Sequence, residues 1–173
     1  MALAKSDLLR KANLYQKPIH EVQYAEITKA KKTAFLCHSH KDVEQVKGLI
    51  VWFREEGIDL YIDWMDHSLP EVPSAETARK LKEKIEFCNL FYFLATSNST
   101  ASRWCPWEIG YADSSQKSVV IIPTSDSINN YGNEYLGLYP RIDTGTEGSR
   151  AGLALFEIGK SKGLWLSDAI RKM

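Results

Sequence analysis

One short stretch of the sequence, residues 102–113, gathers side chains that could do chemistry: two tryptophans, a cysteine and a glutamate. Pro106 suits the first turn of a helix, whose backbone N–H groups lack partners, so we expect a helix from residues 103–105 to about residue 115. Trp104 and Glu108 are four residues apart and would share one face of it. Their indole and carboxylate could then line one cleft, the first stacking on a flat ring and the second contacting a sugar or a developing cation. Alternatively, both tryptophans belong to the core and Glu108 is an ordinary acid favoured by the helix dipole.

The composition indicates one globular domain without a dominant charge. The 173 residues are 44% hydrophobic and 25% charged, which is enough to bury a core. The 22 basic and 22 acidic residues give a formal net charge of zero, so the charge balance favours neither a nucleic-acid nor a membrane partner. We find no signal peptide and no apolar run close to the roughly 18 residues of a membrane span. These features predict a cytoplasmic protein.

The three cysteines, Cys37, Cys88 and Cys105, are widely spaced and form no CxxC pair. This pattern is typical of reduced thiols and not of a disulfide framework. Cys105 lies at the expected helix N-terminus, which can lower the pKa of a thiol.

Short apolar runs alternate with helical periodicity along the chain and would position the residue 102–113 stretch. The continuous apolar run at residues 90–95 is typical of a central parallel strand covered on both faces. Alternating strands and helices predict an α/β fold, a flavodoxin-like open parallel sheet with helices on both faces, and ligands outside the carboxyl ends of the strands. We expect strands at residues 33–37, 58–62, 90–95 and 119–123, a fifth near 135–142 or 154–158, and helices over 43–57, from Ser74, over 103–115 and from Ser167.

The first 32 residues are predicted to form a helical arm and linker, with Ser6 capping the helix and Pro18 ending it. Residues 33–173 would form the α/β domain, which ends in a Gly-rich C-terminal extension.

A polar turn follows the first expected strand. Ser39 and Asp42 have the Ser-x-x-Asp spacing of a capping box, which would place free helix N–H groups just beyond the strand, where an anion such as a pyrophosphate could dock. A purely structural capping turn explains the same spacing. His38 and His40 could bind a metal, but no third ligand of usual spacing is near, so we expect no metal.

Several nucleotide enzymes are disfavoured by missing motifs. The chain has no GxGxxG fingerprint and no P-loop. A phospho-receiver needs an acid at the end of a central strand, whereas the strand at 90–95 continues into Thr96 and Ser97.

The loop over residues 63–73 is longer than usual connections and is therefore functional or mobile. It carries Trp64, Met65 and Leu69 beside the expected site.

Three segments resemble a bacterial Toll/interleukin-1 receptor (TIR) domain: Ala34 to Asp42, Tyr61-Ile62-Asp63-Trp64, and Trp104-x-x-x-Glu108. The resemblance covers roughly residues 33–123. It implies the flavodoxin-like fold and, in many members, cleavage of NAD at the nicotinamide–ribose bond. It also implies that Glu108 is the catalytic acid and that the substrate-binding residues are Trp104, His38, Ser39, His40, Lys41, Asp42, Asp63 and Trp64.

The resemblance therefore implies an NAD+ hydrolase or cyclase that yields ADP-ribose or a cyclic ADP-ribose-type messenger in bacterial antiphage defence. NAD+ would be the substrate, and no cofactor is expected. The implied partners are further copies of the chain, through TIR–TIR contacts in which the 63–73 loop takes part, and a downstream effector that senses the product. The alternative is a non-catalytic TIR adaptor that acts through homotypic contacts, and a third possibility is a nucleoside-processing transferase with a nucleophilic carboxylate.

Overall fold

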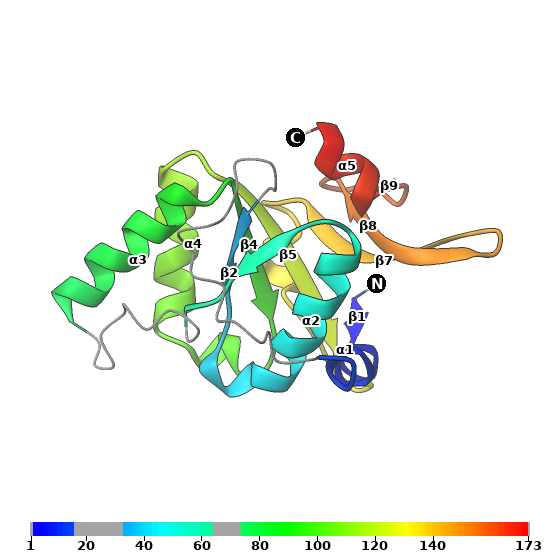
Figure 1. Ribbon diagram of the computed structural model, residues 1–173, viewed down its shortest axis with the longest axis horizontal. Helices are drawn as coiled ribbons and strands as arrows, with labels where there is room; N and C mark the ends of the chain where they lie inside the picture. Colours follow the sequence, from blue (N-terminus) through cyan, green and yellow to red (C-terminus); the bar gives the residue numbers. More distant parts are fainter. Residues whose placement is uncertain (1, 16–32, 64–73, 173) are drawn as a thin grey trace.

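The computed structural model describes residues 2–15, 33–63 and 74–172. At its centre lie four parallel strands in the order β3, β2, β4, β5 (Figure 1). This order reverses direction between β2 and β4, as in a flavodoxin-like sheet, and confirms the expected fold class. The four strands are β2 (Thr33–Cys37), β3 (Asp59–Tyr61), β4 (Leu90–Ala95) and β5 (Ser118–Ser125).

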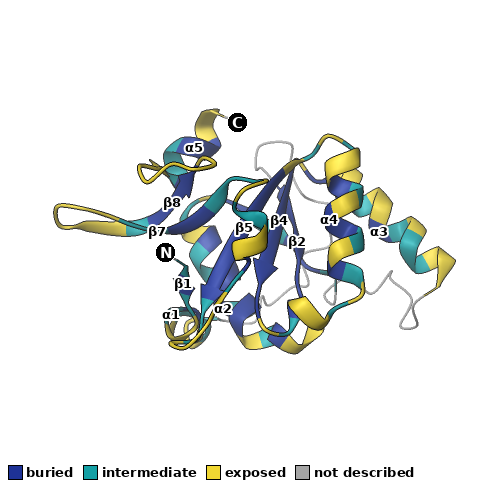
Figure 2. Cartoon of the chain, turned by 180° about the vertical axis from the view of Figure 1, so that it is seen from behind, coloured by how far each residue is buried: buried dark blue, intermediate teal, exposed yellow. Residues whose placement is uncertain are grey.

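Helices cover both faces of this sheet. Helix α2 (Val43–Glu55) packs on one face together with α1 (Lys5–Ala12) and α5 (Leu166–Lys172). Helices α3 (Ala75–Phe87) and α4 (Trp104–Ser114) cover the other face. All residues of β2 and β4 are buried, which explains their continuous apolar sequence, and Figure 2 shows this buried centre.

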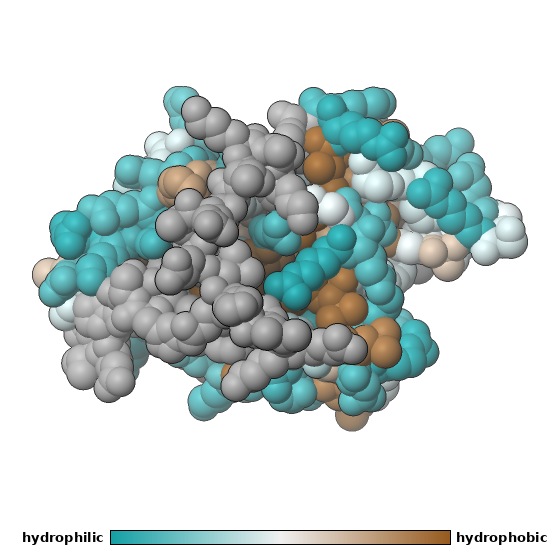
Figure 3. All heavy atoms as spheres, viewed as in Figure 1, coloured by the Kyte–Doolittle hydropathy of each residue, from teal (hydrophilic) through white to brown (hydrophobic). Residues whose placement is uncertain are grey.

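Local sequence signals account for the start of α3. The Ser74 hydroxyl accepts the backbone N–H of Thr77, and the Thr77 hydroxyl accepts the N–H of Ser74, which together form a capping box. Lysines and glutamates of α3 give the hydrophilic surface seen over this helix in Figure 3. In the described part of the chain, no helix is both long enough and apolar enough to cross a membrane.

The N-terminal segment adds to the sheet. Strand β1 (Leu3–Ala4) pairs with the carboxyl end of β5, and α1 packs against α2, so that Leu3 and Leu8 are fully buried. The predicted cap at Ser6 is wrong. Helix α1 begins at Lys5, because the pairing of β1 fixes the chain as far as Ala4, whose side chain forms no capping hydrogen bond. Pro18 and the linker lie outside the described residues, and the division at residue 32 stays a prediction.

Beyond β5 the chain builds a second, antiparallel part of the sheet. Strand β7 (Arg141–Glu147) runs parallel to β5 and pairs with β8 (Arg150–Phe156) in a hairpin that projects from the body (Figure 1). Both stretches considered for a fifth strand thus hold strands, although β7 starts only at Arg141. Most of this hairpin could not be predicted from the alternation of apolar and polar residues, because its strands contain glycines and many polar residues. The remaining short elements are β6 (Asn130–Tyr131), β9 (Leu164–Trp165) and 3-10 helices at His40–Asp42, Ser99–Ala101 and Asn133–Tyr135.

Candidate functional site

Helix α4 presents Glu108 from its second turn. The Ser102 hydroxyl accepts the backbone N–H groups of Trp104 at 3.2 Å and Cys105 at 3.3 Å, and Pro106 occupies a first-turn position that needs no donor. The expected helix is confirmed to within one residue at its C-terminal end. Because α4 follows β4, its first turns lie near the carboxyl ends of the parallel strands.

Glu108 is a buried acid, with 6% of its surface exposed. Burial raises the pKa of its carboxyl from an ordinary 4.5 to about 8. The charge of Asp63 raises this pKa as well, while a hydrogen bond with Cys37 and the charge of His40 lower it. Four side chains from β2, the turns after β2 and β3, and α4 therefore act on one carboxyl group: Cys37, His40, Asp63 and Cys105.

Asp63 brings the two histidines together at the end of β3. Its Oδ2 lies 2.8 Å from Nε2 of His40, and its Oδ1 lies 3.6 Å from Nε2 of His38. The hydrogen bond with Asp63 raises the pKa of His40, whereas burial lowers the pKa of His38. His38 Nδ1 donates to the Leu36 carbonyl at 2.9 Å, and its buried Nε2 has no hydrogen-bond partner within the described ranges.

The turn after β2 differs from the predicted capping box. The Ser39 hydroxyl accepts the N–H of Lys41, two residues ahead, instead of that of Asp42. The fully buried Asp42 carboxylate accepts hydrogen bonds from Thr96 Oγ1 at 2.5 Å and Asn98 Nδ2 at 2.6 Å. Asp42 therefore ties the β2–α2 turn to the segment after β4 through two charge-assisted hydrogen bonds.

Trp104 is half-buried and packs edge-on against Trp107, with ring centroids 5.4 Å apart. Trp107 in turn stacks on Tyr111, and the Lys82 ammonium lies over both of these rings. The half-buried indole of Trp104 also packs against the core on the α4 side of the sheet. A stacking role for Trp104 stays a prediction. Lys41 is exposed, and Trp64 lies outside the described residues.

All three cysteines are free thiols and buried. Burial raises the pKa of the Cys37 and Cys88 thiols, the latter to about 12. The pKa of Cys105 is lowered, as the helix position predicted, but the leading cause is a hydrogen bond with Cys37.

Among the described residues no group of three or more His, Cys, Asp and Glu side chains is arranged to hold a metal ion.

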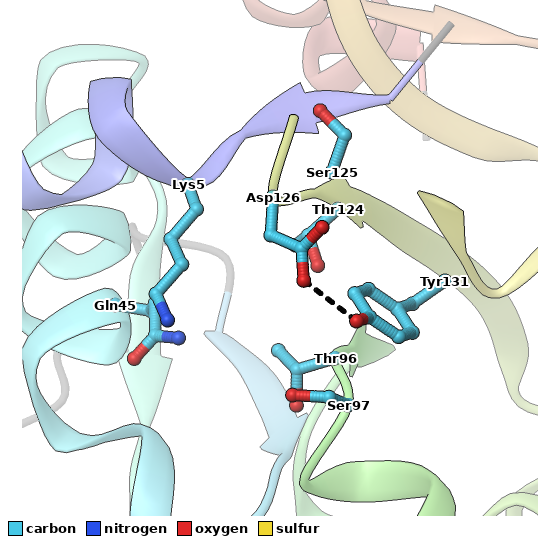
Figure 4. Close-up of a pocket in the computed structure, with 8 residues that line it drawn as sticks. All are labelled: Lys5, Gln45, Thr96, Ser97, Thr124, Ser125, Asp126 and Tyr131. Carbon is cyan, nitrogen blue, oxygen red and sulfur yellow. Dashed lines mark hydrogen bonds between the residues drawn. The ribbon is translucent and has the colours of Figure 1, made fainter. Parts of the chain in front are cut away.

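A small polar hollow lies at the carboxyl ends of β4 and β5, on the α1 and α2 side. In Figure 4, Lys5 and Gln45 face Thr96 and Ser97, and Tyr131 donates a hydrogen bond of 2.7 Å to Asp126. The hollow is partly open to solvent and encloses space for little more than a water-sized group, far less than a small-molecule pocket. It is too small for a dinucleotide. Its remaining lining residues are Thr124 and Ser125.

Comparison with known proteins agrees with this geometry. Residues 34–153 match the family described as TIR domain. The chain belongs to the TIR domain family. Within this TIR domain the match includes Asp42, Asp63 and Glu108 together with the strands that bring them to one edge of the sheet.

Two curated relatives are similar to this TIR domain. One, from Bacillus cereus (strain MSX-D12), carries the name of a 3' cyclic ADP-D-ribose synthase, ThsB', and is 40% identical over 65% of this chain and 61% of its own length. The other, from Cytobacillus dafuensis, carries the name of a cyclic ADP-D-ribose synthase, TIR2, and is 34% identical over 53% of this chain. The chain thus spans about three fifths of the first relative and only 25% of the second.

One solved structure also overlaps with this TIR domain, the CMP N-glycosidase BcmB of Clostridium botulinum. It is 22% identical, covers 52% of this chain and 67% of its own, and has a TM-score of 0.39. An overlap of this size supports no inference about activity.

Sequence reasoning missed Thr96 and Asn98, which hold Asp42. The available signal was the abrupt change from an apolar central strand to Thr96-Ser97-Asn98. Polar side chains that directly follow a central strand at the reversal of strand order lie where ligands and their supports gather.

Proposed function

We propose that this TIR domain binds NAD+ beside Glu108 and cleaves its nicotinamide–ribose bond, giving ADP-ribose or a cyclic ADP-ribose-type product. The proposal rests on one observation, the buried carboxyl of Glu108 within Trp104-x-x-x-Glu108. The charge of Asp63 raises the pKa of this carboxyl, and the charge of His40 lowers it. The names of the two relatives support the same class of reaction.

The chemistry of the bond fits a carboxylate. Nicotinamide leaves NAD+ as a neutral molecule, and positive charge develops on the ribose as an oxocarbenium-like transition state. A carboxylate beside the ribose stabilises that charge, as in glycoside hydrolysis. Nicotinamide release needs no proton from the protein, so Glu108 acts in its charged form.

The raised pKa of Glu108 is compatible with this role. Nicotinamide is cationic in NAD+, and a nearby positive charge favours the ionised form of an acid. Substrate binding would therefore lower the pKa of the Glu108 carboxyl and favour its charged form. For a cyclic product, a ribose hydroxyl must lose a proton as it attacks, and a group whose pKa lies near neutrality suits that step.

The other candidate residues have different parts in this proposal. His38, His40 and Asp63 form the polar wall nearest Glu108, and Ser39 and Lys41 present the turn after β2 to the phosphates. Asp42, also a candidate substrate-binding residue, supports that turn through Thr96 and Asn98. Trp104 would stack on a ring of the nucleotide, together with Trp64. NAD+ acts as substrate, and no separate cofactor is required.

The assembly and cellular role belong to the same proposal. Copies of the chain associate through TIR–TIR contacts, and the nucleotide product is sensed by a separate effector protein in antiphage defence. Both steps take place in the cytoplasm.

Incubation of the purified protein with NAD+, followed by chromatography of the products, tests the activity. Glu108→Gln removes the charge with little change in volume and should lower the cleavage rate on the order of a hundredfold or more. Asp113→Asn, which alters an exposed acid of the same helix, should keep the wild-type rate. Equal turnover by Glu108→Gln and wild type would contradict the role of Glu108. Absence of product at high protein concentration would favour the non-catalytic adaptor.

A further inference from the structure

Asp63 holds the two histidines of the β2–α2 turn from the neighbouring strand. Strand β3 pairs in parallel with β2, so the residues that follow the two strands meet at one edge of the sheet. There Asp63 Oδ2 lies 2.8 Å from Nε2 of His40, and Oδ1 lies 3.6 Å from Nε2 of His38. The two imidazole rings stack, with centroids 5.9 Å apart and planes inclined by 27°. The ring of His40 is therefore fixed at one edge by a hydrogen bond and on one face by His38.

The acceptors around the two rings determine where the protons lie. An ionised carboxylate and a carbonyl oxygen only accept, so the ring nitrogen that faces each of them carries hydrogen. His38 donates from Nδ1 to the Leu36 carbonyl at 2.9 Å, and its buried Nε2 holds a lone pair when the ring is neutral. His40 donates from Nε2 to Asp63. In neutral His40 the lone pair is therefore on Nδ1.

The end of β2 also contacts the helix that carries Glu108. Cys37, the last residue of β2, places its Sγ 3.9 Å from the carbonyl oxygen of Cys105. Glu108 lies three residues beyond Cys105, on the same side of α4. The charges of Glu108 and His40 affect each other's pKa, as expected for groups at one edge of the sheet. The side chain of His40 is 71% exposed, so a bound molecule has access to its ring.

The proposed reaction needs a proton acceptor. Once nicotinamide leaves, the oxygen of a ribose hydroxyl or of water bonds to C1′, and its proton must be removed. If Glu108 took this proton, it would lose the charge that stabilises the ribose cation. A separate base with a pKa near neutrality leaves Glu108 ionised, and an imidazole has this property.

We propose that Asp63 is a positioning residue that holds His40 with Nε2 protonated, so that Nδ1 of His40 accepts the proton of the attacking hydroxyl. This role rests on the function proposed above for Glu108. The electron pair of the C1′–nicotinamide bond goes to nicotinamide, the bond between C1′ and oxygen forms, and the hydroxyl proton passes to Nδ1 and then to water. Asp63 acts only through His40, as a carboxylate does when it sets the tautomer of a catalytic imidazole.

The charge of the carboxylate also strengthens the base. The hydrogen bond with Asp63 is the main reason why the pKa of His40 is raised. A ring with a raised pKa binds the hydroxyl proton more tightly.

Variants at Asp63 separate the tautomer from the shape of the side chain. Asp63→Asn keeps the shape, but its amide can donate to His40 as well as accept and no longer fixes the tautomer. Asp63→Glu keeps the carboxylate. Asp59→Asn is the matched control, because Asp59 is also partly buried but begins β3 at the opposite edge of the sheet.

The first readout is the ¹⁵N NMR spectrum of the His40 ring in the unliganded protein, at a pH where the ring is neutral. The signals are assigned by their absence in His40→Gln. The wild type, Asp63→Glu and Asp59→Asn should carry the hydrogen on Nε2, whereas Asp63→Asn should show a mixture of tautomers.

The second readout is the ratio of product formed to labelled nicotinamide exchanged into NAD+. Exchange requires cleavage of the C1′–nicotinamide bond but no base, so the ratio should fall about tenfold or more in Asp63→Asn and in His40→Gln. Asp63→Glu should restore part of it. Imidazole added to His40→Gly should restore part of the product formation, because the position is open to solvent.

The outcomes separate this role from the proposed function. An unchanged ratio in His40→Gln, or no rescue of His40→Gly, would overturn the role of His40. An unchanged tautomer in Asp63→Asn, or an equal fall of the ratio in Asp59→Asn, would overturn the role of Asp63. In these cases a Glu108→Gln variant that has lost both product and exchange leaves the proposed function standing. A fully active Glu108→Gln variant would overturn the proposed function and, with it, the part of His40 in the reaction.

Discussion

The Glu108 carboxyl binds its proton more tightly in the folded protein than in the unfolded chain, because burial removes water from the charged form. Its folded pKa of about 8 lies above the ordinary 4.5. The resulting contribution to stability is fully present below pH 4.5 and is lost as the pH rises towards 8.

We therefore expect Glu108→Gln to gain stability relative to the wild type as the pH rises. The gain should grow by up to about 1.4 kcal/mol per pH unit between the two pKa values and then level off. Thermal melts of both proteins at pH 5 and pH 8.5 measure it. A difference in Tm that is the same at both pH values would mean that Glu108 titrates as an ordinary exposed acid.

At the scale of elements, a hydrogen-bond bridge joins the β2–α2 turn to the segment after β4. Thr96 Oγ1 donates to Asp42 and accepts the backbone N–H groups of Asn98 at 3.1 Å and Ser99 at 3.0 Å. The bridge crosses the point where the strand order reverses, which is where the candidate site lies.

Thr96→Val should cost about 2–3 kcal/mol of stability, because it leaves the buried Asp42 carboxylate without one of its donors. Chemical denaturation of the variant and the wild type measures this loss. Thr100→Val is the control: its exposed hydroxyl donates to the Ser97 carbonyl, and its loss should change stability by less than about 0.5 kcal/mol. Equal effects at the two positions would show that the bridge adds no stability.

The contact between α1 and α2 depends on a glycine. A Cβ atom added to Gly48 would lie 2.0 Å from the backbone carbonyl oxygen of Leu8, a distance that forces the helices apart. The close approach explains how an eight-residue helix remains docked with Leu8 fully buried.

Gly48→Ala should therefore destabilise the protein by about 1–3 kcal/mol through overpacking. Gly110→Ala, also within a helix but with open space around the added Cβ, should stabilise it by about 0.5–1 kcal/mol. Urea unfolding midpoints of the two variants give opposite signs if the helix contact is as close as described. Two stabilised variants would contradict it.

At the scale of the whole molecule, the candidate site is continuous with the 63–73 loop through Asp63. The loop residues beyond Asp63 lie outside the described part of the chain, so the prediction of a contact with a neighbouring subunit rests on their sequence. That sequence includes the large apolar residues Trp64, Met65 and Leu69, which are the basis of the prediction.

Specific activity is expected to rise with protein concentration, because assembly would complete the site. Rates measured over a wide concentration range, down to dilute monomer, test this expectation, and a flat line would exclude it. Asp66→Lys should lower the activity at a fixed concentration and recover part of it when the protein is concentrated.

The sequence by itself determined the elements that carry the site. The apolar runs of β2, β4 and β5 and the helical periodicity of α2 indicate buried positions along a local segment. Pro106, which suits a first turn, indicates where α4 begins. The same reasoning placed Glu108 on a helix after a central strand and predicted the flavodoxin-like order. The structure confirms both.

Only the tertiary structure decided which side chains meet. Asp42 binds Thr96 and Asn98 instead of its own helix end, the Cys37 thiol reaches the carbonyl of Cys105, and the N-terminal segment adds β1 beside β5. These partners are far apart in the sequence, and their contacts exist because particular strands become neighbours in the sheet. A pattern of spacing records which residues are buried, whereas the partner of a buried polar group depends on which donors and acceptors the folded chain brings within hydrogen-bonding distance.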